Sequence, residues 1–526
     1  MKFSFSLLAF VLFFALSSPV GADLFQVSGI VFLDNNRNLL MDQGEMPLAG
    51  VSVSNQRQVV QTDFEGRYSL PLDDNAIIFV TVPSYLRAPL DENNLPRFYY
   101  IHQPDGGPSF RFPTIAPTGP LPPSVDFPLF PGEHREDFTA LIFGDPQPNT
   151  REHLRFLRDD IVAPLIGDDA DFSIALGDIL FDNLSLFPEY IQSMGRLGIP
   201  VYNVAGNHDI NYDAETDRDS LETFKKHLGP PFYSFDYGNV HFVILDDVYH
   251  YVEKRDGKRI PRYKGKIGKD QLEWLANDLR YVPKNKLLVI SMHIPLFTTT
   301  NGTNRENILD FGETVEIVRA FENVLFLTGH AHTNEHHFLA ENTGRNRHKP
   351  IHQIICGAVC GGWWSGPVDD RGIPASPQGD GVPNGYYRIE FKDNQYVERF
   401  IPACLDPDFQ LRIETPAGSI PYDELTTGLV TINVFDGTSY STVECLLNGT
   451  VPVSLAHSRL KSPWFESLMK NHKDTFRSWL HAVDSNHIWQ GPLPSNIAPG
   501  FHTLTAATVD RHGRRWNSSI VFEVTR

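Results

Sequence analysis

The chain has 526 residues, enough for two to four domains with substantial hydrophobic cores. Its formal net charge of −19 at pH 7 argues against a nucleic-acid or anionic-membrane surface, because phosphate groups are bound by clustered Lys and Arg. Four cysteines are too few for a disulfide-stabilised scaffold; Cys356 and Cys360 either form a bridge or pack as buried free thiols, and we favour free thiols.

The N-terminus carries a predicted export signal. Lys2 is followed by an apolar stretch over residues 7–16 and by small residues ending at Ala22. This pattern is typical of a secretory signal peptide, and its apolar part is too short to span a bilayer. We therefore expect residues 1–22 to be removed and the mature chain to be soluble, without a membrane span, in the periplasm or outside the cell.

Residues 23–132 predict a small all-β domain with a Pro-rich linker. Short alternating stretches favour the strands of a β-sandwich near residues 25–31, 51–53, 58–62, 68–70 and 77–82. From residue 87 the chain is rich in Pro and Gly, which indicates a linker that ends near Gly132. Within it, residues 99–102 and 125–127 suit additional edge strands.

The same domain contains a candidate calcium loop. Oxygen-bearing side chains fall at positions one, three, five, nine and twelve of a calcium-loop spacing: Asp34, Asn36, Asn38, Asp42 and Glu45. The sixth position, where such loops have Gly, is Leu39, and no helix is predicted before it. A solvated Asx-rich turn explains the pattern at least as well. The stretch also resembles the calcium-stabilised B-type repeats of secreted adhesins, so calcium is kept as a second hypothesis.

Residues 133–403 alternate apolar strands with helical patterns, as α/β domains do. Strands are expected near residues 140–143, 172–176, 201–204, 240–245, 287–291 and 324–328, and helices near residues 151–165, 187–197, 219–228, 272–279 and 312–320. The side chains able to do chemistry come just after the predicted strands: Asp145, Gln147, Asp178, Asp182, Asn207, His208, Asp209, His293, His330 and His332. Open α/β sheets place their ligands at this carboxyl edge.

Residues 404–526 return to short strands. They are expected near residues 411–413, 429–434, 442–447, 503–508 and 520–524, with one Trp-containing helical insertion near 463–482. We interpret this region as a second β-sandwich.

The motif order resembles that of the calcineurin-like metallophosphoesterase superfamily. Gly-Asp-x-x at 144, Gly-Asp at 177, Gly-Asn-His-Asp at 206, a single His at 293 and Gly-His-x-His at 329 follow one another as in that superfamily. The stretches 232–238, 271–275, 361–364 and 384–386 resemble its secreted subfamily, which has its own N- and C-terminal accessory domains. The resemblance implies an α/β fold with a four-layer α/β/β/α core, flanked by two all-β sandwich-like domains, and a metal-dependent phosphoesterase activity.

The resemblance also implies a role for each site residue. Asp178 would bridge two divalent ions about 3.5–4 Å apart. One ion would be completed by Asp145 and His332, with Gln147, and the other by Asn207, His293 and His330. A bridging hydroxide would attack a phosphomonoester or phosphodiester, and His208, oriented by Asp182 or Asp209, would protonate the leaving group. Ligands of this mixture, without thiolate, suit Mn, Fe, Zn or Mg.

Two hypotheses remain open at the level of sequence. The superfamily usually has Asp-x-His in its first motif, whereas this chain has Gln147, whose neutral oxygen predicts a weaker or water-mediated ligand. The alternative to the enzyme is therefore a catalytically idle extracellular binding protein that uses its β-sandwich domains. His241 lies outside every motif and is interpreted as structural, and Trp363 and Trp364 are interpreted as core residues rather than a substrate platform.

Overall fold

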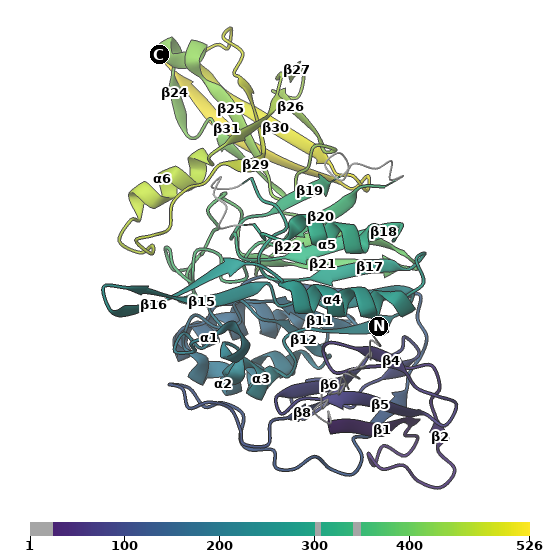
Figure 1. Ribbon diagram of the computed structural model, residues 1–526. Helices are drawn as coiled ribbons and strands as arrows, with labels where there is room; N and C mark the ends of the chain where they lie inside the picture. Colours follow the sequence, from purple (N-terminus) through teal and green to yellow (C-terminus); the bar gives the residue numbers. More distant parts are fainter. Residues whose placement is uncertain (1–24, 300–306, 340–348) are drawn as a thin grey trace, which may run out of the picture.

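The computed structural model describes residues 25–299, 307–339 and 349–526 (Figure 1). The predicted signal peptide, residues 1–22, lies outside the described residues. An N-terminal β-rich region, a central α/β region and a C-terminal β-rich region follow one another along the molecule in chain order (Figure 1). None of the helices in the described segments has the length and apolar character needed to cross a bilayer.

The N-terminal region is a sandwich of two sheets. One sheet contains β2 (Met46–Pro47), β1 (Phe25–Leu33), β9 (Phe127–Pro131) and β7 (Leu86–Arg87), with β5 (Arg67–Leu72) also paired to β1. The other contains β4 (Val59–Gln61), β3 (Ser52–Ser54), β6 (Ala76–Val80) and β8 (Tyr99–His102). Alternation in β5 turns Tyr68, Leu70 and Leu72 into the core. The end of the expected linker is not an edge strand: β9 lies between β1 and β7.

The candidate calcium loop forms a compact turn in the structure. The carboxylate of Asp34 is buried and accepts the backbone N–H of Leu39 at 2.8 Å. The side-chain amides of Asn36 and Asn38 both donate to Asp42 Oδ2 at 2.8 Å. Leu39 adopts a φ of 66°, a left-handed conformation for which Gly is normally preferred. These bonds are those of an Asx-rich turn, and calcium at this loop stays a prediction.

Two mixed sheets stack face to face in the central region. The first has the order β12 (Val201–Val204), β11 (Phe172–Leu176), β10 (Asp137–Phe143), β21 (Gly385–Lys392) and β22 (Gln395–Pro402). The second has the order β13 (Tyr233–Tyr237), β14 (Val240–Ile244), β17 (Leu287–Ser291), β18 (Asn323–Thr328), β20 (Ile351–Ile355) and β19 (Glu335–Leu339). Aromatic rings join them: Phe172 of the first sheet lies 5.3 Å from Phe242 and 5.7 Å from Phe235 of the second.

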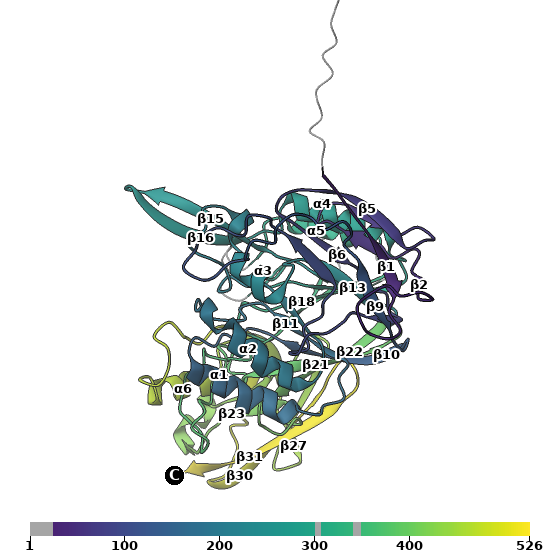
Figure 2. The ribbon, with the colours of Figure 1, turned by 90° about the horizontal axis from the view of Figure 1, so that it is seen from below.

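Helices cover the outer faces of the two sheets. Figure 2 shows α4 (Lys269–Asp278) and α5 (Phe311–Val318) on one side of the stacked sheets, and α1 (Arg151–Leu157) and α2 (Phe187–Met194) on the other. Strands β11, β14, β17 and β18 are buried along their whole length, as expected for strands covered on both faces. The four-layer α/β/β/α core implied by the resemblance is therefore present. Helix α3 (Glu222–Leu228) precedes β13, and the hairpin β15 (Val248–Arg255) and β16 (Lys258–Gly265) projects from the domain (Figure 2).

The C-terminal region is the second sandwich. One sheet has the order β23 (Leu411–Thr415), β25 (Leu429–Val434), β29 (Ser485–Pro492) and β28 (Ala456–Leu460). The other has the order β24 (Ser419–Pro421), β31 (Arg515–Thr525), β30 (Gly500–Val509), β26 (Thr442–Leu447) and β27 (Val451–Pro452). The predicted helical insertion is helical only over α6 (Pro463–Asn471). The segment 472–484 that follows it has no strand or α-helix.

His241 joins three elements of the central region from a buried position. Its Nδ1 lies 2.7 Å from Asp236 Oδ1 on β13, and its Nε2 lies 2.9 Å from Asp278 Oδ2 on α4. Burial by itself lowers a histidine pKa, but the negative charges of Asp278 and Asp236 outweigh it and raise the pKa of His241 to about 9. Lys286 Nζ contacts Asp236 from the other side at 2.8 Å.

We expect this arrangement to make stability depend on pH. A histidine whose folded pKa exceeds its unfolded value of about 6.5 contributes fully below pH about 6.5, and its contribution is lost as pH rises through about 9. The loss has an upper limit of about 3 kcal/mol. Urea unfolding between pH 6.5 and 9.5 should therefore show falling stability in the wild type and a shallower decline in His241→Gln. Equal slopes in the two proteins would contradict this origin.

Candidate metal centre

The carboxyl ends of parallel strands from both sheets meet at one edge. β10, β11 and β12 run parallel in the first sheet, as do β14, β17, β18 and β20 in the second. The loops that follow five of these strands bring together nine of the ten side chains expected from the sequence: Asp145 and Gln147 after β10, Asp178 and Asp182 after β11, Asn207 and His208 after β12, His293 after β17, and His330 and His332 after β18. The tenth, Asp209, is directed towards backbone N–H groups instead.

One group of ligand atoms surrounds His293. Its Nε2 lies 3.2 Å from Asp178 Oδ1, from Asn207 Oδ1 and from His330 Nδ1. Its Nδ1 lies 2.8 Å from the carbonyl oxygen of Leu176. A ring N–H donated to that carbonyl leaves Nε2 as the lone-pair atom, which is how metal-binding histidines are usually oriented. Ligand atoms of Asp178, His293 and His330 lie within 4.8 Å of one another.

The second group contains Asp145 and His332. The Nε2 atom of His332 lies 3.8 Å from Asp145 Oδ1, and its Nδ1 lies 2.7 Å from the carbonyl oxygen of Gly361. This ring is therefore oriented as His293 is, with Nε2 towards the carboxylate. Asp145 is buried and accepts the backbone N–H of His330 at 2.9 Å, so the two groups share one loop.

Gln147 lies between the two groups. Its Nε2 donates to Asp178 Oδ2 at 2.6 Å, and its Oε1 accepts from the Cys360 thiol at 3.5 Å. In this orientation the amide binds the proposed bridging carboxylate, and ligation of a metal through Oε1 requires the amide to turn over. Cys356 and Cys360 are both buried free thiols, as the sequence favoured.

The backbone of the site is held in uncommon conformations. Asp145, Asp178 and His330 have φ values of 43°, 48° and 72°, in the left-handed region that non-glycine residues seldom occupy. The motif glycines permit close approach: a Cβ at Gly206 would lie 1.9 Å from the backbone nitrogen of Asp178, and one at Gly177 would lie 2.7 Å from the His293 ring. Glycine at these positions therefore allows the backbone to fold tightly around the candidate ligands.

The electrostatics of the site fit divalent cations. Burial raises the pKa of Asp145 to about 7. Burial also opposes ionisation of Asp178, but the charges of protonated His293 and His208 outweigh it and hold the pKa of Asp178 below its ordinary value. The negative charge of Asp178 in turn outweighs burial and raises the pKa of His293 to about 10, so a cation that binds His293 Nε2 must displace a proton. Burial lowers the pKa of His330 to about 3, which keeps this imidazole neutral, as a metal ligand must be. Among the described residues, no Lys or Arg forms an ion pair with either carboxylate.

A further buried carboxylate, which was not expected from the sequence, also favours binding of a cation at this site. Asp247 is fully buried after β14 and accepts the backbone N–H of His293 at 3.2 Å. Its Oδ2 has no hydrogen-bond partner in the described parts of the chain, and burial raises the pKa of Asp247 to about 7. Positive charge beside His293 would compensate this group. Its position just after a buried strand is the signal that could have identified it.

His208 has the surroundings expected of a proton donor. Its Nδ1 lies 2.8 Å from Asp182 Oδ1, and its Nε2 lies 4.0 Å from Asp178 Oδ2. The ring stacks on Phe181 with centroids 4.3 Å apart and stays partly exposed, so a substrate can reach it. Burial lowers the pKa of His208, but the charge of Asp178 and the bond to Asp182 outweigh it and raise the pKa above its usual range.

Of the two residues expected to orient His208, the structure selects Asp182. The carboxylate of Asp209 is buried and accepts the backbone N–H groups of Ile179 at 3.0 Å, Leu180 at 2.9 Å and Gly206 at 2.8 Å. Asp209 therefore ties the loop after β11 to the loop after β12 and has no hydrogen bond to the His208 ring.

The two tryptophans of the Gly-Gly-Trp-Trp motif differ. Trp364 is buried and donates from Nε1 to the carbonyl of Pro146 at 2.9 Å, as expected of a core residue. Trp363 is only partly buried and stacks on His332 with centroids 4.2 Å apart. Trp363 therefore packs against the core, as expected, and its ring also faces a candidate metal ligand.

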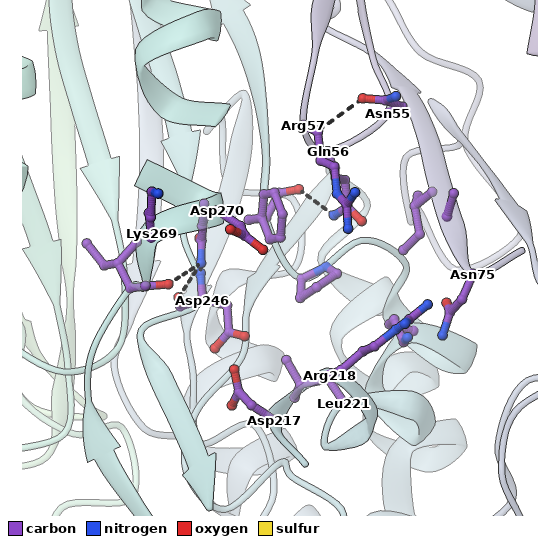
Figure 3. A pocket seen from close by; sticks show the side chains of 18 of the residues that line it. Asn55, Gln56, Arg57, Asn75, Asp217, Arg218, Leu221, Asp246, Lys269 and Asp270 are labelled. Carbon is purple, nitrogen blue, oxygen red and sulfur yellow. Dashed lines mark hydrogen bonds between the residues drawn. The ribbon is translucent and has the colours of Figure 1, made fainter. Parts of the chain in front are cut away.

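A separate cavity of about 570 Å³ lies between the N-terminal sandwich and the α/β domain (Figure 3). Asn55, Arg57 and Asn75 line it from one side, and Asp217 and Asp246 from the other (Figure 3). Burial raises the pKa of Asp217 to about 6. Neither His208 nor any of the candidate metal ligands lines this cavity, so the chemistry belongs to the strand ends.

Comparisons with known proteins agree with this geometry. Three family models match in order: "N terminal of Calcineurin-like phosphoesterase" at residues 35–113, "Calcineurin-like phosphoesterase" at 138–334, and "C terminal of Calcineurin-like phosphoesterase" at 354–516. The middle model spans the loops from Asp145 to His332. No curated protein matches the chain.

Two solved structures are similar to parts of the chain. A dimetal phosphatase from Danio rerio is 14% identical, with 51% of this chain and 97% of that chain covered and a TM-score of 0.36. The purple acid phosphatase PPD1 from yellow lupin seeds is 14% identical, with 67% of this chain and 66% of that chain covered and a TM-score of 0.36.

Proposed function

The chain belongs to the calcineurin-like phosphoesterases with N- and C-terminal accessory domains, and on this premise we propose that it hydrolyses phosphate esters using two divalent metal ions. The observation that carries the proposal is the convergence of Asp178, Asn207 and His330 on His293 Nε2, each at 3.2 Å. These side chains come from four separate loops, and their donor atoms match the ligand preferences of Mn, Fe, Zn and Mg.

The residues divide between the two ions as follows. His293, Asn207 and His330 would hold one ion, Asp145 and His332 the other, and Asp178 would lie between them. When bound, the ions supply an activated water and stabilise charge during displacement at phosphorus. Asp247 holds the loop of His293 through its backbone N–H, so it is a positioning residue.

His208 serves as the general acid in this proposal. Asp182 accepts the Nδ1 proton of the ring, which leaves Nε2 facing the site with the proton that it gives to the departing oxygen. Phe181 supports the ring from one face and limits its rotation. The leaving alcohol would therefore depart at the Nε2 edge of His208, next to Phe181.

We expect Gln147 to make metal binding weaker without abolishing turnover. An oxygen ligand favours Mn or Mg over Zn at this position, so activity in stripped wild-type protein should return on addition of metal, with Mn effective. Gln147→His should bind metal more tightly and remain active, which calorimetric titration and a phosphate-release assay would measure. Gln395→His, at the exposed start of β22, is the matched control and should behave as wild type.

The idle binding protein makes the opposite prediction. Wild type would then release no phosphate from any mono- or diester with Mn, Fe, Zn or Mg, whereas Gln147→His would gain activity. That pair of results would overturn the phosphoesterase proposal in favour of the binding protein.

Export is also proposed, on the strength of residues 1–22. Expression of the full chain in a secreting host, followed by mass determination of the released protein, should give a mature form that begins at Asp23. Retention of the full-length form inside the cell would contradict it.

A further inference from the structure

A segment of the C-terminal domain is fixed against the metal-site loops. In residues 472–484, the carbonyl of Thr475 accepts the N–H of Gly366 at 3.0 Å, and the N–H of Val483 donates to the carbonyl of Gly379 at 2.9 Å. Between them, Leu480 packs so closely that a Cβ at Gly362 would lie 2.6 Å from its Cδ2. The segment is therefore anchored to the α/β domain on both sides of Trp479.

Trp479 stays exposed despite these anchors. Its relative exposure is 49%, whereas Leu480 beside it is buried. The indole lies 6.3 Å from the Phe181 ring with an interplanar angle of 5°, and 6.0 Å from the Trp363 ring with an angle of 74°. Because Phe181 stacks on His208 and Trp363 stacks on His332, Trp479 lies in the middle of an arc of rings. This arc runs from the proposed acid to a candidate metal ligand.

The positive charge of Arg477 lies beside the exposed indole, and one terminal nitrogen of its guanidinium lies 3.4 Å from His153 Nε2. The guanidinium of Arg477 is 5.8 Å from the centroid of Trp479. Its Nε is buried without a hydrogen-bond partner, and within the described residues Arg477 forms no ion pair with a carboxylate. An exposed indole next to a guanidinium suits a flat ligand that stacks on the ring and accepts hydrogen bonds.

We propose that Trp479 and Phe181 form a leaving-group subsite for a planar aromatic group, which makes nucleotides the favoured substrate class. This inference rests on the proposed function, because the leaving group is located by His208. Phe181 lies next to the acid, and the exposed indole of Trp479 lies parallel to the Phe181 ring, so a base attached to the departing sugar can stack on the indole. Base–aromatic stacking is expected to improve kcat/KM by about ten-fold.

Adenosine 5′-monophosphate and ribose 5-phosphate test the subsite. Both release phosphate from the same primary alcohol, and only the first carries a base. With Mn-loaded protein we expect kcat/KM to favour the nucleotide by about ten-fold in wild type. In Trp479→Ala this ratio should fall towards one, and in Trp479→Phe, which keeps a flat ring, most of it should remain. Tyr440→Ala, which removes another exposed aromatic ring of the same domain, is the control and should keep the wild-type ratio.

Binding provides a second readout that does not need turnover. Stacking quenches an exposed indole, so adenosine 5′-monophosphate should quench the fluorescence of wild type more than ribose 5-phosphate does, and Trp479→Phe should lose the difference. A wild-type ratio near one, or a ratio that Trp479→Ala leaves unchanged, would overturn the subsite. If neither ester is hydrolysed with any metal, the proposed function fails, and the fluorescence difference then decides the subsite alone: its presence supports stacking on Trp479, and its absence overturns it.

Discussion

Replacing Asp178 with Asn is expected to remove most of the bound metal and to reduce phosphate release to the background rate. Asp178 Oδ1 lies 3.2 Å from His293 Nε2, and Asp178 Oδ2 is in contact with Gln147, so one oxygen faces the His293 group and the other faces Gln147 between the two groups. An amide in its place removes a negative charge and one of the two oxygen ligands. The loss of affinity should exceed the about 10–100-fold that removal of an outer-shell partner causes. Elemental analysis after dialysis gives the metal content per chain.

A matched control separates this effect from a change in the backbone. Asp256, at the exposed tip of the β15–β16 hairpin, has a φ of 51°, close to the 48° of Asp178. Asn tolerates this left-handed conformation, so both Asp→Asn variants should fold, as circular dichroism would show. Asp256→Asn should keep its metal and activity. Unchanged metal stoichiometry in Asp178→Asn would remove this residue from the bridging role.

Replacing His208 with Ala is expected to retain the metal and to lower turnover by about a hundred- to ten-thousand-fold. The side chain lies outside the two ligand groups, with its Nε2 4.0 Å from Asp178 Oδ2, and its role in the proposal is to protonate the departing oxygen. A leaving group that is stable as an anion needs no such proton. The loss should therefore be large for alkyl phosphates and small for nitrophenyl phosphate, and steady-state kinetics on both give the comparison.

The neighbouring carboxylates provide the controls for His208. Asp182→Asn should reproduce part of the His208→Ala defect with the same dependence on leaving group, because only the orientation of the ring is weakened. Asp209→Asn should instead lower thermal stability, since its carboxylate holds three backbone N–H groups. An equal loss on good and poor leaving groups in His208→Ala would contradict the acid role.

The sequence, together with the family resemblance that its motifs carry, was sufficient to predict the layered core and most of the side chains that meet at one edge of it. Each motif follows a strand whose apolar run shows that it is buried, and parallel strands carry their carboxyl ends to one edge, so Asp145, Asp178 and His293 could be expected to meet. The motif glycines are equally local, because Gly177 and Gly206 are needed wherever a backbone turns sharply around a ligand. Buried strands, their direction and the glycines of tight turns depend on residues close together in the chain, so the sequence pattern predicts them.

Only the tertiary structure decided which residues complete the site. Asp182 and Asp209 are equally plausible partners of His208 in sequence. The left-handed backbone of the loop after β11 brings Asp182 to the ring, whereas Asp209, after β12, accepts backbone N–H groups. Trp479, more than a hundred residues beyond the last candidate ligand, His332, lies against Trp363 next to the site. The pairing of β9 between β1 and β7 likewise joins distant segments. Such contacts are determined by packing between segments that are far apart along the chain. The periodicity of side chains within one segment does not show which distant segment will pack against it.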